Sequence, residues 1–539
     1  AVSATAEASL AAVRMLEAGG NAIDAAVAAA LALGSTDPGG SGLGGQTWMV
    51  VRLASGVERA IFCPARAPMR YDAGRLRAAR RGSELWGPMA AAAPTTLATL
   101  DHALRTYGSL PFATVVQPAI EAADAGYPIH DFERSFLDDY KHRVFDSELL
   151  LPVFLTGPTG ESGYPDPAPV GRCVVLPGLA RTLRRLAASG PADFYRGAIA
   201  ADLEADVRAA GGFLSRSDLA GVPASVRDVA PVRGVFRGRT VLSVPSPAGG
   251  SALVMALQIL DALPRETLAA PGLARGQAIV EAVRLARAQA GLRRLTGEVT
   301  DGPFLSPWLT PEWAAGEARR VRIGQAIPQA ELLQGGAPLP PDLGTTHLSV
   351  ADAEGNVVSL TQSLGRYYGA AWAPPSLGFP LSSYVELLDS HDRSHPAYLV
   401  PGAAAPVPVA PAVVVEEGRA TLVAGTGGSS RIPSILASFL VALWDGGDTT
   451  AEALARPRLL WEEDSAGPRV MLEPVPPFAA ADADALRAMG YPKVFTLLAP
   501  GRNTPVFGGL HIVLRDEARG TWAGWLDGRR AGVAAAPSR

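Results

Sequence analysis

Residues 344–350 read Gly-Thr-Thr-His-Leu-Ser-Val, and their alternation of polar and apolar side chains predicts a β-strand in the middle of the chain. Two interpretations of Thr345 are open from these residues. Threonine is common in strands, so Thr345 is either an ordinary strand residue or a residue that becomes a new N-terminus when the Gly344–Thr345 bond is cut. In the second case its hydroxyl becomes a nucleophile. Spacing alone favours the ordinary strand residue.

A threonine at a chain terminus would carry its own base. A threonine hydroxyl is a poor nucleophile without a neighbouring proton acceptor. The α-amino group has a reference pKa of about 7.7 to 8.0, so an appreciable fraction is neutral near pH 7. The sequence holds no His-Glu-x-x-His pattern, and its seven histidines are scattered. We therefore expect neither a metal site nor a cofactor.

The composition is that of a globular protein. Of 539 residues 48% are hydrophobic and 19% charged, which predicts two domains or two intimately packed halves. The net charge of −4, without a basic block, argues against nucleic acid as a partner. No apolar run is long enough to span a membrane, and no secretory signal is evident, which leaves the bacterial periplasm and the cytoplasm open. Cys63 and Cys173 allow one disulfide at most, and two unpaired thiols are favoured.

The pattern of elements changes along the chain. We expect helices at 4–18 and 22–33, within 86–129 and 177–210, and at 276–294. Residues 145–175 are loop-rich, and 302–343 are irregular and proline-rich. Strands are expected at 47–53, 240–244, 346–351, 356–362, 412–416, 421–424, 508–515 and 521–526, with an apolar helix at 432–444. The helix-rich part therefore ends, and the strand-rich part begins, near Thr345.

A glycine-rich loop lies at residues 37–45, Asp-Pro-Gly-Gly-Ser-Gly-Leu-Gly-Gly. It precedes a strand instead of opening a helix, and it lacks the Gly-Lys-Ser/Thr ending of a phosphate-binding P-loop. Close backbone packing near a site is therefore the favoured interpretation.

Several blocks, in order along nearly the whole chain, resemble the γ-glutamyltransferases of the N-terminal nucleophile hydrolase superfamily. The blocks are Gly19-Gly-Asn-Ala-Ile-Asp-Ala-Ala-Val27, Ser41-Gly-Leu-Gly-Gly45, Gly190-Pro-Ala-Asp-Phe-Tyr-Arg-Gly197, Ala209-Ala-Gly-Gly-Phe213, Val280-Glu-Ala-Val-Arg-Leu-Ala286, Thr345-Thr-His-Leu-Ser-Val-Ala-Asp352 and Asp527-Gly-Arg-Arg-Ala-Gly532. The resemblance implies an α+β fold, a four-layer αββα sandwich. It also implies self-cleavage between Gly344 and Thr345 into a large subunit, 1–344, and a small subunit, 345–539, with a higher oligomer left open.

The same resemblance implies roles for particular residues. Thr345 would be the nucleophile and, through its freed amine, the general base. Thr346 and Ser363 match hydroxyls that support the nucleophile, although each is equally well explained as a strand residue bonded to the backbone. Residues 425–431, Gly-Thr-Gly-Gly-Ser-Ser-Arg, resemble the family's oxyanion loop. Its donors would be Gly427 and Gly428, or Gly428 and Ser429; a flexible turn is the alternative.

The γ-glutamyl recognition elements of the family are replaced. Pro64 stands at the place of an arginine, with Arg66 two residues on as a substitute, and Gly365 stands at the place of an asparagine. Leu387 takes the place of the ammonium-binding carboxylate, and we expect the neighbouring Glu386 to face away on a strand. Val407-Pro408 replaces a pair of serines. The expected substrate site is therefore more apolar, lined by Tyr384, Leu387, Val407, Pro408, Arg66 and Ser429.

Three hypotheses follow from the sequence. The first is a self-processing amidohydrolase or acylase that cleaves a small-molecule amide other than a γ-glutamyl amide, similar to acylases of cephalosporins or glutaryl amides or to oxamate amidohydrolase. The second is a genuine γ-glutamyltransferase or glutathione hydrolase with a rearranged pocket. The third is a catalytically silent scaffold that keeps the fold.

Overall fold

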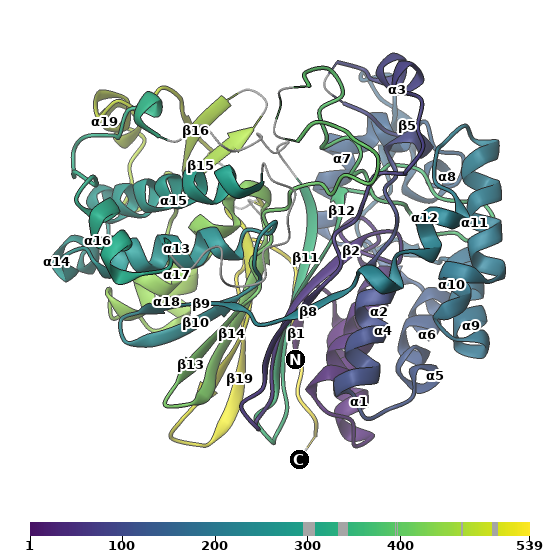
Figure 1. Ribbon diagram of the computed structural model, residues 1–539, viewed down its shortest axis with the longest axis horizontal. Helices are drawn as coiled ribbons and strands as arrows, with labels where there is room; N and C mark the ends of the chain where they lie inside the picture. The colour runs from purple at the N-terminus through teal and green to yellow at the C-terminus, as the bar shows by residue number, and fades with distance from the viewer. Residues whose placement is uncertain are drawn as a thin grey trace.

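The computed structural model describes residues 1–82, 84–294, 308–332, 343–393, 395, 397–464, 467–497 and 505–538. Two large β-sheets face each other in the middle of the molecule, and helices lie on the outer side of each sheet (Figure 1). The expected α+β class is confirmed.

The first sheet contains β11, the strand near the start of which the Gly344–Thr345 bond lies. Its seven strands run antiparallel to their neighbours in the order β20-β1-β11-β12-β2-β3-β8. Their bounds are β20 Val533–Ala534, β1 Val2–Ser3, β11 Leu343–Ala351, β12 Val357–Arg366, β2 Gln46–Arg52, β3 Glu58–Phe62 and β8 Arg227–Val229. Strands from before and after Thr345 are thus interleaved in one sheet. The two parts of the chain are therefore intimately packed halves and not separate domains.

The second sheet has six antiparallel strands in the order β19-β18-β14-β13-β10-β9. They are β19 Thr521–Leu526, β18 Gly509–Asp516, β14 Arg419–Gly427, β13 Ala412–Glu416, β10 Arg239–Ser243 and β9 Val232–Phe236. Serine hydroxyls tie the two sheets together: Ser349 donates to the carbonyl of His511, and Ser359 to that of Ala424, each at 3.0 Å.

Two helices near the N-terminus pack against β11 from outside. Helix α1, Ala6–Glu17, packs on α2, Ala22–Thr36, every residue of which is buried. A capping box of Asn21 and Asp24 starts α2. Leu348 and Val350 of β11 share a hydrophobic cluster with α2, because alternate strand residues point to the same side. The C-terminal end of α2 delivers the glycine-rich loop toward Thr345.

The remaining helices cover both outer faces (Figure 1). On the first sheet's side lie α3 Ala73–Ala79, α4 Thr96–Tyr107, α5 Phe112–Val115, α6 Gln117–Ala125, α7 Asp131–Val144, α8 Leu151–Phe154, α9 Pro177–Ser189, α10 Ala192–Arg196, α11 Ala198–Ala209 and α12 Arg216–Ala220. On the second sheet's side lie α13 Gly250–Asp261, α14 Arg265–Ala269, α15 Leu273–Arg294, α16 Pro311–Ala318, α17 Ile432–Trp444, α18 Thr450–Ala455 and α19 Asp482–Ala488. A small sheet, β15 Leu459–Asp464, β16 Gly467–Leu472 and β17 Val494–Thr496, lies beside α15.

Most differences from the sequence-based elements are additions. Helices α7 and α13 and strand β3 had no counterpart in the prediction, and the loop-rich segment 145–175 contains the short helix α8 and short strand pairings. The prediction of irregular structure at 302–343 is wrong for α16, which begins with Thr310 as a side-chain cap and Pro311 in the first turn. Residues 302–307 and 333–342 lie outside the described part.

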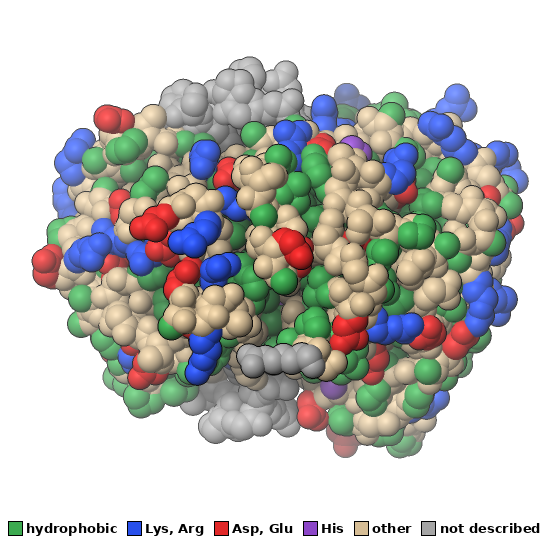
Figure 2. All heavy atoms as spheres, turned by 90° about the horizontal axis from the view of Figure 1, so that it is seen from below, with side chains coloured by type: hydrophobic (Ala, Val, Ile, Leu, Met, Phe, Trp, Pro, Cys, Tyr) green, Lys and Arg blue, Asp and Glu red, His purple; other side chains and the backbone are tan. Residues whose placement is uncertain are grey.

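The surface and the cysteines are ordinary for a globular protein. On the face shown in Figure 2, basic and acidic side chains are interspersed with apolar ones. Both cysteines are free thiols, Cys63 buried and Cys173 exposed, which confirms the favoured interpretation. None of the described helices combines the length and apolar character that crossing a membrane requires.

Candidate active site

Thr345 lies buried at the start of β11, opposite Ser363 of β12. Its Oγ1 donates a hydrogen bond to Ser363 Oγ at 3.2 Å, and Ser363 Oγ in turn donates to the carbonyl oxygen of Gly344 at 2.7 Å. The backbone N–H of Gly365 donates to Ser363 Oγ at 3.0 Å. Ser363 thus accepts two hydrogen bonds and donates one, which is the full capacity of a hydroxyl group. The Ser363 hydroxyl thus links the Thr345 hydroxyl to the Gly344 carbonyl through two hydrogen bonds.

The backbone around this bond is tightly packed and continuous. The β11–β12 register shifts between Gly344 and Thr345, and a Cβ atom on Gly344 would lie 2.9 Å from the carbonyl oxygen of Gly39. A Cβ on Gly45 would lie 2.4 Å from the carbonyl oxygen of Ser363. Such contacts exclude a side chain at these positions. The glycine-rich loop therefore packs its backbone against the candidate cleavage site, as its sequence predicted.

His347 does not act on the threonine hydroxyl. Its ring is buried, with Nδ1 2.9 Å from Thr361 Oγ1 and Nε2 3.0 Å from Ser349 Oγ. Burial lowers the pKa of His347 well below its usual value, and the nearby His511 lowers it further. The imidazole is therefore neutral and held in the space between the two sheets. His347 is therefore not placed to accept the proton of the Thr345 hydroxyl.

Thr346 faces away from Ser363, toward the glycine-rich loop. Its hydroxyl lies near the carboxyl group of Asp37 and lowers the pKa of that carboxyl. The larger effect is burial, so that the pKa of Asp37 is raised to about 7. Thr346 was predicted to support the nucleophile, and the structure places its hydroxyl beside an acid that the sequence did not single out.

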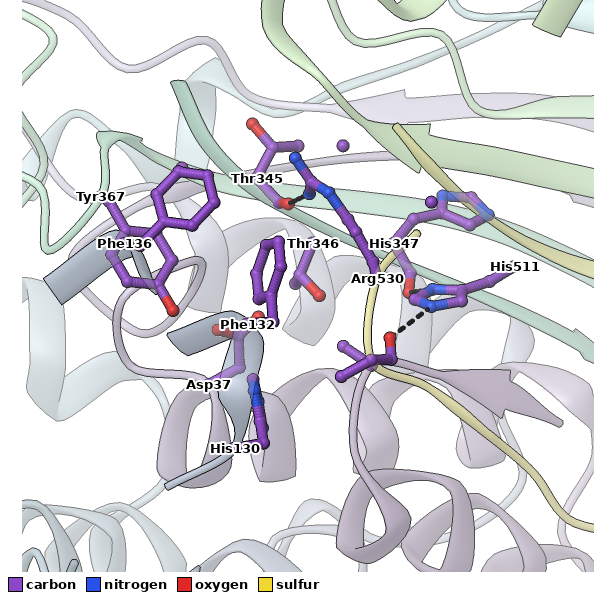
Figure 3. A pocket seen from close by; sticks show the side chains of 15 residues that line it. Asp37, His130, Phe132, Phe136, Thr345, Thr346, His347, Tyr367, His511 and Arg530 are labelled. Carbon is purple, nitrogen blue, oxygen red and sulfur yellow. Dashed lines mark hydrogen bonds between the residues drawn. The ribbon is translucent and has the colours of Figure 1, made fainter. Parts of the chain in front are cut away.

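Arg530 reaches Thr345 from the C-terminal segment. Its Nη1 donates to the carbonyl oxygen of Thr345 at 3.0 Å, and its guanidinium lies 4.9 Å from the ring centroid of Phe132. Figure 3 shows Asp37, Arg530, Phe132, Phe136 and Tyr367 around a small pocket beside Thr345 and Thr346. A cation–π contact of this kind helps to hold the guanidinium beside Thr345.

The predicted oxyanion loop lies next to Thr345. Gly427 ends β14 and lines the pocket, and a Cβ atom on it would lie 2.3 Å from the carbonyl oxygen of Thr345. Gly428 and Ser429 follow with positive φ angles of 143° and 55° before the helix α17. The neighbouring Arg431 is buried and paired with Glu462. Both candidate donor pairs, Gly427 with Gly428 and Gly428 with Ser429, belong to this bend.

The predicted substrate wall is apolar and closely packed. Tyr384 is buried, and its hydroxyl donates to the carbonyl oxygen of Ser363 at 3.2 Å. Leu387 and Val407 belong to the large hydrophobic cluster that contains residues of both sheets, and Pro408 is buried beside Val407. Tyr384 is thus brought to the Thr345–Ser363 pair.

Arg66 does not reach this pair. Its Nη1 donates to the carbonyl oxygen of Gly402 at 3.0 Å, and it does not line the pocket at Thr345. The structure therefore gives no support to Arg66 as a substitute for the family's arginine.

Glu386 is committed to a buried ion cluster. Its carboxylate lies 3.0 Å from Arg143 Nη2 and 3.2 Å from Arg366 Nη2, and the three side chains are almost fully buried. Residues 384–387 form a turn and not the expected strand, because the Leu387 N–H bonds back to the Tyr384 carbonyl. The strand from which Glu386 was expected to face away is therefore absent, and what the structure shows is its pairing with Arg143 and Arg366.

Sequence reasoning missed the residues on the pocket side of Thr346. Asp37 opens the glycine-rich loop and Arg530 lies in the terminal Asp-Gly-Arg-Arg block, but no spacing rule joins the two ends of the chain. Phe132 and Phe136 come from α7, which was not predicted at all. No group of three or more His, Cys, Asp or Glu side chains suited to a metal ion occurs among the described residues.

Known proteins resemble this chain in sequence and in fold. The family model described as gamma-glutamyltranspeptidase matches residues 8–537. The glutathione hydrolase proenzyme of Escherichia coli (strain K12) is 31% identical over 470 residues, which are 83% of this chain and 78% of that protein. The acylase ACY 1 proenzyme of Pseudomonas sp. (strain V22) is 30% identical over 520 residues, 94% of this chain and 88% of that protein.

A solved structure of cephalosporin acylase from Bacillus halodurans superimposes with a TM-score of 0.82 at 25% identity, and the match covers 100% of this chain and 95% of that one. The relatives are thus split between acylases and glutathione hydrolases. The chain belongs to the γ-glutamyltranspeptidase family, the members of which are amidohydrolases and transpeptidases of the N-terminal nucleophile superfamily.

Proposed function

We propose that the chain is a precursor that cuts itself between Gly344 and Thr345 and becomes an amidohydrolase with Thr345 as its nucleophile. The large subunit, 1–344, and the small subunit, 345–539, stay together because each sheet contains strands of both. The layered arrangement is then the αββα sandwich of the N-terminal nucleophile hydrolases. Both relatives named above are called proenzymes, which supports self-processing of this chain.

The observation that carries the proposal is the chain of hydrogen bonds through Ser363. In self-cleavage, Thr345 Oγ1 attacks the carbonyl carbon of Gly344, and Ser363 holds the carbonyl oxygen on which negative charge develops. The Gly344–Thr345 C–N bond breaks, the hydroxyl proton ends on the Thr345 nitrogen, and an ester joins Gly344 to Thr345 Oγ1. Water then hydrolyses this ester, giving a carboxylic acid at Gly344 and the free hydroxyl and amine of Thr345.

Turnover repeats the same chemistry on a substrate amide. The neutral amine of Thr345 takes the hydroxyl proton while Oγ1 attacks the amide carbonyl, and the proton then passes to the leaving amine. An acyl ester on Thr345 remains, and water or another amine removes the acyl group. Backbone N–H groups of Gly427 and Gly428, or of Gly428 and Ser429, stabilise the oxyanion. Ser363 holds the Thr345 hydroxyl, and the Thr346 hydroxyl lies on the other side of the strand, near Asp37.

The acyl group is one that lacks the γ-glutamyl ammonium and carboxylate. Leu387, Val407 and Pro408 supply no charged partner, Glu386 is held by two arginines, and Arg66 is bonded to Gly402. An ammonium or carboxylate left unpaired in a buried site costs several kcal/mol, which removes useful affinity. The activity therefore resembles that of acylases acting on cephalosporin or glutaryl amides, or of oxamate amidohydrolase. The ACY 1 similarity over 94% of the chain supports this choice.

Glutathione hydrolysis or γ-glutamyl transfer is the second candidate. The observation in its favour is the 31% identity to the Escherichia coli glutathione hydrolase. This candidate shares the nucleophile and the self-cleavage, and it differs only in the residues that hold the acyl group.

A substrate panel separates the two candidates. We expect hydrolysis of simple acyl and glutaryl anilides with kcat/KM at least about 100-fold above that for γ-glutamyl anilide and glutathione, because about 3 kcal/mol of ammonium and carboxylate binding is missing. Equal or greater turnover of γ-glutamyl anilide would overturn the choice of substrate while leaving Thr345 as the nucleophile. A protein that stays one 539-residue chain and hydrolyses neither substrate class would contradict the whole proposal.

A further inference from the structure

The strand that carries Thr345 has an edge that β1 covers only in part. Strand β1 pairs with β11 where Val2 lies opposite Ser349, four residues after Thr345. Nearer the nucleophile, side chains take over this edge: Arg530 Nη1 donates to the Thr345 carbonyl oxygen, and His511 Nδ1 lies 2.8 Å from the His347 carbonyl oxygen. Carbonyls of alternate residues point to the same side of a strand, so these contacts and the Val2 pairing share one edge.

The nitrogen of Thr345 faces this edge as well. In an antiparallel strand the N–H and C=O of one residue point to the same side, because paired residues exchange both bonds. Cleavage of the Gly344–Thr345 bond would therefore leave the new amine on the side of Arg530. This is also the side of the pocket that both residues line.

That pocket is a small cavity with a mainly apolar lining and a few polar groups. Its volume is about 20 Å³, room for about one water molecule. The Thr346 hydroxyl and the Tyr367 hydroxyl are buried there, and neither makes a hydrogen bond of normal geometry within the described part of the chain, although Thr346 lies near Asp37. Figure 3 shows both hydroxyls and the Asp37 carboxyl turned toward the same space. Two hydroxyls and a carboxyl are the partners that a buried water requires.

Several titratable groups surround Asp37. His130 and His511 also line the cavity, and burial lowers the pKa of each, so both are neutral at pH 7. From α7, Glu133 has its pKa raised by burial to about 8, while it accepts hydrogen bonds from Tyr127 and Tyr368 at 2.7 Å. Burial also raises the pKa values of Tyr127, Tyr367 and Tyr368 well above their usual range. Near neutral pH, Arg530 is thus charged and Asp37, with its pKa of about 7, is about half ionised, while the other groups of this set are mainly neutral.

We infer that Asp37 and Arg530 are positioning residues that set the protonation state of the freed Thr345 amine from the edge of β11. The guanidinium of Arg530 disfavours a second positive charge beside it and keeps the amine neutral and able to accept a proton. Ionised Asp37 has the opposite effect, because a negative charge favours the protonated amine. Across the cavity, it also orients the amine. This inference rests on the proposed role of Thr345 as nucleophile.

The test is the pH dependence of kcat/KM in the processed enzyme, measured with the preferred anilide. The acidic limb of that profile reports the base of the free enzyme. We expect Asp37→Asn to move this limb to lower pH, and Arg530→Gln to move it to higher pH, each by about one unit, because a charge within about 4–6 Å shifts a pKa by that order.

Three controls separate electrostatics from a merely structural role. Arg530→Lys keeps the charge, Tyr367→Phe removes a cavity hydroxyl without changing charge, and Asp138→Asn removes an exposed charge on α7. Each should keep the limb within about 0.2 unit of wild type. If the Asp37→Asn precursor does not cleave, Arg530→Gln alone tests the inference. A shift of the acidic limb to higher pH supports it, and a shift to lower pH overturns it.

Shifts of Asp37→Asn and Arg530→Gln in the same direction, or no shift in either, would overturn the inference. The proposed function fails separately, if Thr345→Ala still hydrolyses the anilide. An inert Thr345→Ala together with unmoved limbs would reject the role of Asp37 and Arg530 alone.

Discussion

The nucleophile side and the recognition side of the candidate site are built differently. Around Thr345, short polar side chains and backbone groups form a closed set, in which Ser363 makes three hydrogen bonds and touches the Gly344 carbonyl. Around the predicted substrate wall, Leu387, Val407 and Pro408 are packed into an apolar cluster. From this difference we expect cleavage chemistry and substrate choice to be separable in this fold. Cleavage would then depend on the hydroxyl geometry at Thr345, and substrate choice on side chains from loops.

The largest expected effect on stability lies on the recognition side. Glu386→Gln leaves Arg143 and Arg366 buried beside a neutral amide, so we expect the free energy of unfolding to fall by about 3–5 kcal/mol. Urea unfolding of the uncleaved Thr345→Ala background measures this change on one chain. The matched control is Glu121→Gln, which breaks an exposed pair with Arg14 and should cost less than about 1 kcal/mol. A specific loss of γ-glutamyl affinity with unchanged stability would instead make Glu386 a substrate ligand.

On the nucleophile side, Ser363→Ala should slow self-cleavage by about 10²–10³-fold, or about 3–4 kcal/mol, because the Gly344 carbonyl loses its hydrogen-bond donor. The time course of fragment formation on a denaturing gel measures it. Ser363→Thr keeps the hydroxyl and should restore most of the rate. If Ser363→Ala cleaved at the wild-type rate, the hydrogen-bond chain would have no role in processing, and the contrast between the two sides would disappear.

The remaining prediction concerns the pH dependence of stability, which arises from the buried acids near Thr346. The pKa of Asp37 rises from 3.8 to about 7 on folding, and that of Glu133 from 4.5 to about 8. The folded state therefore binds these protons more tightly than the unfolded state does. Their contribution to the free energy of unfolding should fall as pH rises from about 4 to about 8, by up to about 1.4 kcal/mol per pH unit per group.

Glu133→Gln removes one of these two groups while it retains an oxygen for Tyr127 and Tyr368. Urea unfolding between pH 5 and pH 8 should show a shallower pH dependence in this variant than in the parent chain. An identical slope in both proteins would mean that Glu133 does not keep its proton on folding.

Elements with local signals were predictable from the sequence. The bounds of β13, α17 and β19 agree with the prediction residue for residue. Glu417 and Gly418, which join β13 to β14, have positive φ angles of 47° and 75°. These signals depend on neighbours in sequence, as strand alternation and turn residues do.

The pocket side was not predictable, because it is made by contacts between distant parts of the chain. Asp37, Phe132 and Arg530 come from a loop after α2, from α7 and from the C-terminal segment, and each looks unremarkable in its own stretch. Glu386 was predicted to face away, but its partners Arg143 and Arg366 appear only once α7 and β12 are packed together. Packing, not local pattern, decides which charges meet.

The most direct test of the account is the covalent state of the purified protein. Intact-mass measurement and N-terminal sequencing should show two fragments that remain associated, the smaller beginning with Thr345 and continuing Thr-His-Leu. Thr345→Ala should give one uncleaved chain without amidase activity. A wild-type small fragment that begins at any other residue, or a Thr345→Ala variant that still cleaves and hydrolyses, would contradict Thr345 as the nucleophile.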